Sequence, residues 1–168
     1  PPHLNALLAK ARIFYQAPGA AADTKLPSSS VDAVFSNSVL EHVPKTVMKL
    51  LFAESARILR PHGVSIHGVN CGDHYAYFDR QITQINFLQF SERQWALWNN
   101  DLLYQNRMRP PDFKALLAEA GLEMIFERRH ARPGCAEAFE KLELAPQFRR
   151  YDRNDLVCTS FDFVGRPK

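Results

Sequence analysis

The sequence predicts an α/β fold with a mainly parallel sheet and helices on both faces, and three observations support this class. Apolar runs at 31–35 and 64–70 flank an amphipathic segment, and such a strand–helix–strand unit joins parallel strands. A second amphipathic stretch, 110–121, precedes a strand-like run at 123–128. The final apolar run, 156–164, alternates in polarity, as an antiparallel strand near a sheet edge does.

The N-terminal elements follow from local pattern. Apolar residues between Leu4 and Ala11 share one helical face, and Ile13 to Tyr15 is typical of a short strand that ends at Pro18-Gly19. Leu26-Pro27 and three serines then lead into the run at 31–35. That run is short, rich in valine and almost wholly apolar, which predicts a strand covered on both faces.

The next helix has clear limits. Pro44 suits a first helical position, where its missing N–H costs nothing. The helix must end near Arg60, because Pro61 pushes its predecessor out of the helical region and Gly63 supplies a turn. The apolar or small positions at helical spacing are Val47, Met48, Leu51, Phe52, Ser55, Ile58 and Leu59.

Residues 71–109 form an aromatic, amide-rich segment that we expect to be an insertion or lid within a single domain of residues 1–168. Ser91 to Gln94 is a capping box for a helix. The face of this helix that carries Trp95, Trp98 and Leu102 is predicted to pack in the lid or core rather than to stack on a ligand. Further along, 136–145 is predicted to be helical.

Bulk composition excludes several classes. The net charge is +3, which favours an ordinary surface over a nucleic-acid interface. No run approaches the ~18 apolar residues of a membrane span. The three cysteines are far apart and form no CxxC pair, so we predict neither disulfides nor a thiolate zinc site, and a cytoplasmic location.

Glycine spacing excludes the common nucleotide-binding loops. The seven glycines include no GxG pair, so the chain has neither a GxGxxG fingerprint nor a P-loop. It also lacks the GxSxG elbow and the HExxH helix.

Two long motifs resemble a known family. LPSSSVDAVFSNSVLEHV and LLFAESARILRPHGVSIHGVN are similar to the second half of the class I S-adenosylmethionine-dependent methyltransferases. The second motif departs from the family pattern at His62, where a glycine is usual. DFKALLAEAGLEMIFERR and DLVCTSFDFVG are similar to the family's last helix and terminal strands. The resemblance covers nearly the whole chain from about residue 13.

The resemblance implies a Rossmann-like sheet whose N-terminal strands, with the glycine-rich loop and the ribose-binding acid, lie upstream of residue 1. Asp23 stands one position away from the family's adenine-binding acid. We therefore expect weak or absent S-adenosylmethionine binding by this chain alone. An unpaired strand edge also predicts a homodimer, a swapped sheet or a rearranged one.

The candidate cofactor residues follow the strand at 31–35. The resemblance implies that Ser36, Asn37 and Ser38 line the cofactor cleft at the carboxyl end of a central strand, with Glu41 and His42 flanking it. In the alternative interpretation, the polar residues only satisfy loop backbone groups, while Glu41 and His42 cap the next helix.

The candidate acceptor residues follow the strand at 64–70. They are Asn70, Asp73, His74, Tyr75, Asn106 and Arg107. Asn106 and Arg107 would orient an anionic or sugar-like acceptor, or else form an ordinary helix end. The cluster of His67, Cys71, Asp73 and His74 matches no closed zinc pattern, so we predict no metal.

The resemblance implies a methyltransferase that acts on a small-molecule or saccharide-like acceptor. This chemistry needs mainly alignment of the acceptor with the methyl group, plus an optional base, for which His74 and His42 are the catalytic candidates. The alternative is a catalytically inactive methyltransferase-like module that binds a partner.

Overall fold

The computed structural model describes residues 2–100 and 102–168. The order of the longer elements includes the strand–helix–strand unit predicted for residues 31–70. They are α1 (Pro2–Lys10), β1 (Val31–Asn37), α2 (Lys45–Ile58), β2 (Leu59–Asn70), α4 (Pro110–Glu119), β3 (Leu122–His130) and β4 (Ser160–Pro167). The short helices are η1 (Leu40–His42), η2 (His74–Tyr77), η3 (Asn86–Gln89), α3 (Glu92–Trp95), α5 (Cys135–Phe139), η4 (Pro146–Phe148) and α6 (Arg153–Leu156).

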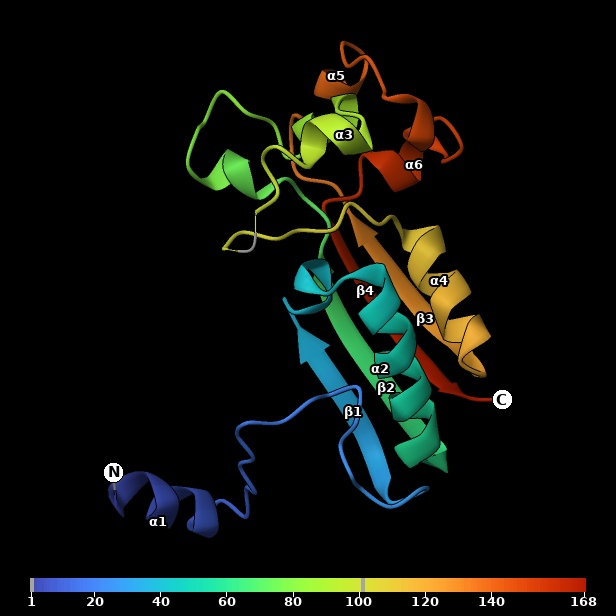
Figure 1. The fold of residues 1–168 in the computed structure, drawn as a ribbon. Coiled ribbons are helices and arrows are strands. Elements are labelled where there is room, and N and C mark those ends of the chain that lie inside the picture. The colour runs from blue at the N-terminus through green and yellow to red at the C-terminus, as the bar shows by residue number, and fades with distance from the viewer. Residues whose placement is uncertain (1, 101) are drawn as a thin grey trace.

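The four strands form one sheet in the order β1-β2-β4-β3 (Figure 1). β1 and β2 pair in parallel, as the strand–helix–strand unit predicts, and β4 pairs antiparallel with both β2 and β3. The α/β class and the antiparallel C-terminal strand are confirmed. The mainly parallel pairing is not seen among the described strands, because β4 inserts between β2 and β3 and runs antiparallel to both.

Helices α2 and α4 pack side by side on one face of the sheet (Figure 1). Their buried side chains meet the inward residues of β2 and β4, which include Phe161 and Phe163 at 0% exposure. The strict alternation of β4 therefore buries every second residue, because successive strand residues point to opposite faces.

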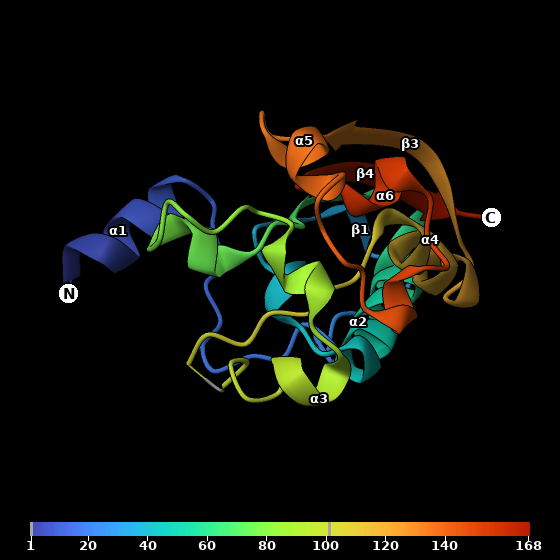
Figure 2. The same ribbon diagram turned by 90° about the horizontal axis from the view of Figure 1, so that it is seen from above.

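None of the described helices covers the opposite face, which corrects the expectation of helices on both faces. Phe35, Ile66, Val164 and Phe126 pair in register across all four strands and form a continuous apolar row, here called the outer row. Phe35 is 80% exposed. Helix α1 lies apart from the sheet (Figures 1 and 2).

The predicted strand at Ile13 to Tyr15 is wrong. These residues have no regular structure, and Phe14 is 89% exposed. Strand propensity forms a strand only where a neighbouring strand offers a ladder, and none of the described strands lies beside this segment. The segment is tied to α2 further along, where Glu54 accepts a hydrogen bond from the Thr24 N–H (2.9 Å).

A second hydrophobic cluster covers the carboxyl end of the sheet (Figure 1). It combines the expected lid segment with residues from α5 to α6. Its buried members are Ile85, Phe87, Leu88, Trp95, Cys135, Ala145, Phe148 and Leu156.

Two helix lengths in this region differ from prediction. The capping box at Ser91 is confirmed, but α3 ends at Trp95, so Trp98 and Leu102 do not share its face and are exposed. Helix α5 ends at Phe139 instead of continuing to residue 145. Short helices gain little from propensity alone, so the packing of Trp95 into the second cluster decides where α3 ends.

Arg109 joins the sheet to this second cluster. Its side chain is 0% exposed, and its guanidinium donates to the carbonyls of Cys71 (2.6 Å) and Cys158 (3.1 Å). It also lies over the ring of Phe87, 5.4 Å from the centroid. Cys71 follows β2 and Cys158 precedes β4, so one cation binds two of the segments that connect the sheet to the second cluster.

Candidate functional site

The three polar residues at the carboxyl end of β1, Ser36, Asn37 and Ser38, lie in three different environments. The hydroxyl of Ser36 bonds Nδ1 of His67 (2.7 Å) on the covered side of the sheet. Asn37 lies on the opposite face, where its Oδ1 stands 2.6 Å from the position that a Cβ on Gly68 would occupy. Ser38 adopts a left-handed conformation (φ 53°), and its N–H donates to the Gly68 carbonyl (2.9 Å).

Small-molecule sites have volumes on the order of 300–1,000 Å³. A cavity of ≈ 630 Å³ opens where β1 and β2 end. The absence of a side chain at Gly68 keeps this space open. The amide of Asn70 bonds the Tyr77 hydroxyl at one side of it (2.7 Å). Its lining residues are Asn37, Ser38, Gly68, Val69, Asn70, Tyr77, Gln84, His130, Arg132, Pro133, Thr159, Ser160 and Asp162.

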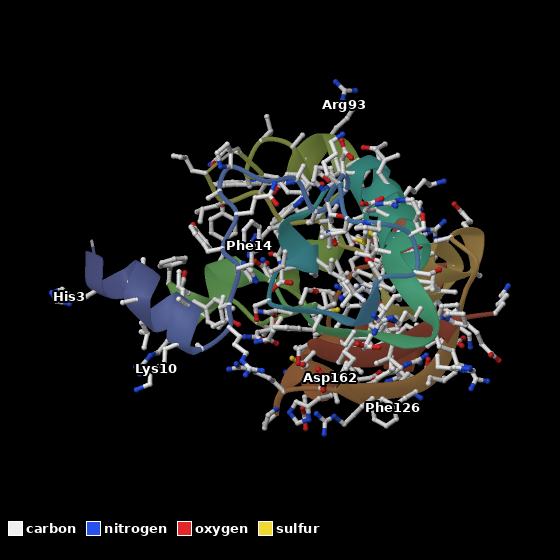
Figure 3. All side chains as sticks on the ribbon, turned by 90° about the horizontal axis from the view of Figure 1, so that it is seen from below. His3, Lys10, Phe14, Arg93, Phe126 and Asp162 are labelled. Atoms are coloured by element: carbon white, nitrogen blue, oxygen red, sulfur yellow. The ribbon has the colours of Figure 1, made fainter. Side chains whose placement is uncertain are left out.

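Sequence reasoning missed the residues that β4 adds to this cavity. Asp162 pairs with Gly68 across β2 and β4, and its carboxylate is bound by Arg128 of β3 (2.6 Å). Figure 3 shows Asp162 and Phe126 on the side of the sheet away from α2. No local motif could have indicated Asp162, because its place follows from the insertion of β4 between β2 and β3.

Three further candidate residues, Glu41, His42 and His74, lie together in η1 and η2. Glu41, His42 and His74 each place one ligand-type atom within 4.8 Å of the others. The rings of His42 and His74 lie 5.1 Å apart between centroids and are tilted by 58°. These two short helices follow β1 and β2, and the ends of neighbouring parallel strands lie together.

Glu41 is the unusual member of this group. It is 1% exposed, and neither carboxylate oxygen has a hydrogen-bond partner in the described chain. Burial raises the pKa of this carboxyl above its ordinary value. Burial lowers the pKa of His74, and the neighbouring His42 adds to that effect.

His42 is fixed by a backbone contact. Its Nδ1 lies 2.8 Å from the Tyr104 carbonyl oxygen. Because a carbonyl only accepts, Nδ1 carries the proton and the lone pair is on Nε2. The alternative in which Glu41 and His42 serve as helix caps does not match these contacts, since α2 begins after Pro44 without a side-chain cap.

Asp73 and Tyr75 are held in structural contacts. The buried Asp73 carboxylate accepts from the Tyr75 N–H at the start of η2 (2.9 Å). The Tyr75 hydroxyl donates to the Trp98 carbonyl (2.7 Å), and its ring meets Trp95 edge-on.

Asn106 and Arg107 line a different cavity of ≈ 440 Å³, beside Tyr104 and Trp95. The Asn106 amide donates to the carbonyls of Leu40 and Val43 and so anchors the lid to η1. Arg107 is 6% exposed. Its guanidinium donates to the carbonyls of Phe87 and Phe90 and pairs with Glu92 (2.9 Å).

The structure does not bring Asp23 to the other candidates. Its carboxylate pairs with Lys25 on the surface, and the adjacent Thr24 is bound to Glu54 near the carboxyl end of α2. His67, Cys71, Asp73 and His74 do not come together as one cluster either. The two ring nitrogens of His67 are instead hydrogen-bonded by the hydroxyls of Ser36 and Ser65.

Residues 5–67 match the family described as methyltransferase domain. No curated protein sequence matches the chain, and no helix among the described residues is long and apolar enough to span a membrane.

Solved structures share the fold at low identity. A candidate sarcosine dimethylglycine methyltransferase from Galdieria sulphuraria has a TM-score of 0.57 at 15% identity over 96% of this chain. Geranyl diphosphate C-methyltransferase from Streptomyces coelicolor, solved with Mg²⁺, geranyl diphosphate and S-adenosyl-L-homocysteine, has 0.53 at 14% over 88%.

The chain spans 63% of the Galdieria chain and 50% of the Streptomyces chain. Residues 5–67 therefore match the methyltransferase domain family, and the described chain shares the fold of these solved methyltransferases.

Proposed function

We propose that the chain forms part of an S-adenosylmethionine-dependent methyltransferase that acts on a small-molecule or saccharide-like acceptor. The observation that carries this proposal is the ≈ 630 Å³ cavity at the carboxyl ends of β1 and β2. In open α/β sheets, ligands bind outside the carboxyl ends of the strands.

The residues at this edge suit the polar parts of the cofactor. The amides of Asn37 and Asn70 and the hydroxyl of Ser38 can exchange hydrogen bonds with ribose and adenine groups. Gly68 leaves the space that a backbone-close ligand requires. When bound, the cofactor supplies an electrophilic methyl group.

The acceptor would enter from the lid side. The ≈ 440 Å³ cavity presents aromatic and amide side chains, a combination that suits a small polar or sugar-like molecule. For an acceptor that must lose a proton, we retain His74 and His42 as candidate bases. Asn106 and Arg107 would act by shaping this cavity, since their donors already bind backbone carbonyls.

Calorimetry with S-adenosylmethionine and with its demethylated product tests the proposal. We expect saturable but weak binding, with a dissociation constant on the order of 0.1–1 mM, because the chain presents one wall of the cleft without a glycine-rich loop. Asn37→Ala should weaken binding about tenfold through the loss of one cavity contact.

Asn154→Ala is the matched control, because Asn154 is an exposed asparagine in α6 outside the cavity. Absence of saturable binding up to millimolar cofactor would contradict the proposal. The inactive, partner-binding module would then be the better assignment.

We further propose a homodimer through the free edge of the sheet. Within the described chain, β1 pairs with β2 alone, and Phe35 of the outer row stands exposed beside that free edge. An unpaired edge next to an apolar surface is a template for pairing with another chain. The three free cysteines support our proposal of a cytoplasmic location.

Light scattering after size exclusion tests the dimer. We expect the mass of two chains for the natural sequence and of one chain for Phe35→Lys, because a charge on the outer row would be desolvated by pairing. Leu50→Lys, an exposed position on α2, should keep the dimer. A monomer with intact strand content in the natural chain would rule the dimer out.

A further inference from the structure

We propose that Glu41, His42 and His74 form a binding site for a borderline divalent transition-metal ion such as Zn²⁺ or Co²⁺. Two imidazole nitrogens and one carboxylate oxygen lie within 4.8 Å of one another. Tetrahedral zinc with bonds of ~2.0–2.1 Å needs ligand atoms about 3.3 Å apart, so small side-chain rotations would close the site.

The state of each ligand supports a cation over a plain hydrogen-bonded cluster. Glu41 buries a carboxylate with no hydrogen-bond partner in the described chain, and a buried charge without a partner is costly. A bound cation would compensate it. His74 buries an Nε2 atom that is likewise unpartnered.

His42 is already oriented as a metal ligand. Its Nδ1–H donates to the Tyr104 carbonyl (2.8 Å), which leaves the Nε2 lone pair for a metal. Metal-bound histidines usually donate their other ring N–H to a carbonyl or carboxylate, because this contact fixes the tautomer and the ring orientation.

The donor set selects the class of ion. Two imidazoles with one carboxylate suit Zn²⁺, Co²⁺, Ni²⁺ or Fe²⁺, whereas Mg²⁺ and Ca²⁺ prefer sites built wholly from oxygen. Three protein ligands leave at least one coordination position for water or an acceptor oxygen. The exposure of His42 provides access from solvent.

The metal gives the same residues a role different from that of a free base. With an ion bound, both imidazole lone pairs are ligands, and the ion itself would orient the acceptor oxygen. The inference does not rest on methyl transfer, and its test uses no S-adenosylmethionine, so the two proposals fail independently.

The test is metal binding to the tag-free, metal-stripped chain. Zn²⁺ is titrated by calorimetry, and Co²⁺ by its visible absorption, which reports coordination geometry. We expect one ion per chain. Glu41→Gln and His74→Ala should each weaken binding by at least about tenfold and change the Co²⁺ spectrum.

His62→Ala and His130→Ala are matched controls, because both histidines are exposed and outside the cluster; they should bind as the natural chain does. Circular dichroism shows whether the variants remain folded, and Glu41→Gln keeps the shape of the side chain. Unchanged Zn²⁺ affinity and Co²⁺ spectrum in folded Glu41→Gln and His74→Ala would overturn the proposal, as would the absence of stoichiometric binding to the natural chain.

Discussion

Replacing Arg109 by methionine should lower the free energy of unfolding by about 4 kcal/mol. The substitution leaves the buried carbonyls of Cys71 and Cys158 without the guanidinium that bonds both. Each buried acceptor that loses its donor costs ~1–3 kcal/mol, and the contact of the cation with the Phe87 ring is lost as well.

Urea unfolding at pH 7, followed by circular dichroism and tryptophan fluorescence, measures this effect. The free energy of unfolding of Arg109→Lys should lie between those of the natural chain and Arg109→Met. A single ammonium keeps the charge but cannot reproduce the planar fork of the guanidinium. Arg93→Met replaces an exposed arginine (Figure 3) and should change stability by less than about 0.5 kcal/mol. Equal stability of Arg109→Met and Arg93→Met would show that Arg109 does not hold the lid to the sheet.

Acidification from pH 7 to pH 4 should cost the fold about 3 kcal/mol through His67 alone. Burial lowers the pKa of His67 to about 4 from its ordinary value of 6.5. The unfolded chain therefore takes up a proton near pH 6.5 that the folded chain refuses until about pH 4. Stability falls by ~1.4 kcal/mol per pH unit in that window, because the unfolded state binds more protons.

The environment of His67 gives this effect its size. Ser36 and Ser65 bond its two nitrogens, and the rings of Phe52 and Phe163 pack against it. None of these groups carries a negative charge that would stabilise the imidazolium. The neutral ring satisfies both serines, so the folded state holds the histidine uncharged.

His67→Gln tests this assignment, because an amide can still bond both serines but does not titrate. Stability is measured by urea unfolding from pH 7 to pH 4. The variant should lose the His67 share of the pH slope, and the exposed His130→Gln should retain the natural slope. Identical slopes for His67→Gln and the natural chain would refute the prediction.

The predictions that the structure confirms rest on residues that are close together in the sequence. The helix predicted from Pro44 to Arg60 and found as Lys45–Ile58, the strands on either side of it and the capping box at Ser91 depend on residues close together in sequence, so periodicity and cap chemistry were sufficient. The turn predicted at Gly63 was wrong, because β2 begins at Leu59 and continues through Gly63 to Asn70. The motif SNSVLEHV also identified the polar exit of β1 correctly.

Two predictions that depended on a distant partner were wrong. Ile13 to Tyr15 has strand propensity but no neighbouring strand among the described strands. Helix α3 is one turn long, and of its predicted apolar face only Trp95 is buried in the second cluster. No sequence motif around Asp162 or Arg109 indicates where these side chains lie in the fold. Asp162 reaches the cavity through β-sheet order, and Arg109 is buried through contacts to segments on both sides of it in the chain.

The sequence by itself determined the strand–helix–strand unit and the polar residues at the ends of its strands, because these depend on side-chain period and local turn chemistry. Only the tertiary structure decided which polar groups are free to act. Asn106 and Arg107 bond carbonyls from other segments, whereas Glu41 is buried without a partner beside His42 and His74. The reason is physical: hydrogen-bond partners are chosen by proximity in space, which sequence spacing does not encode.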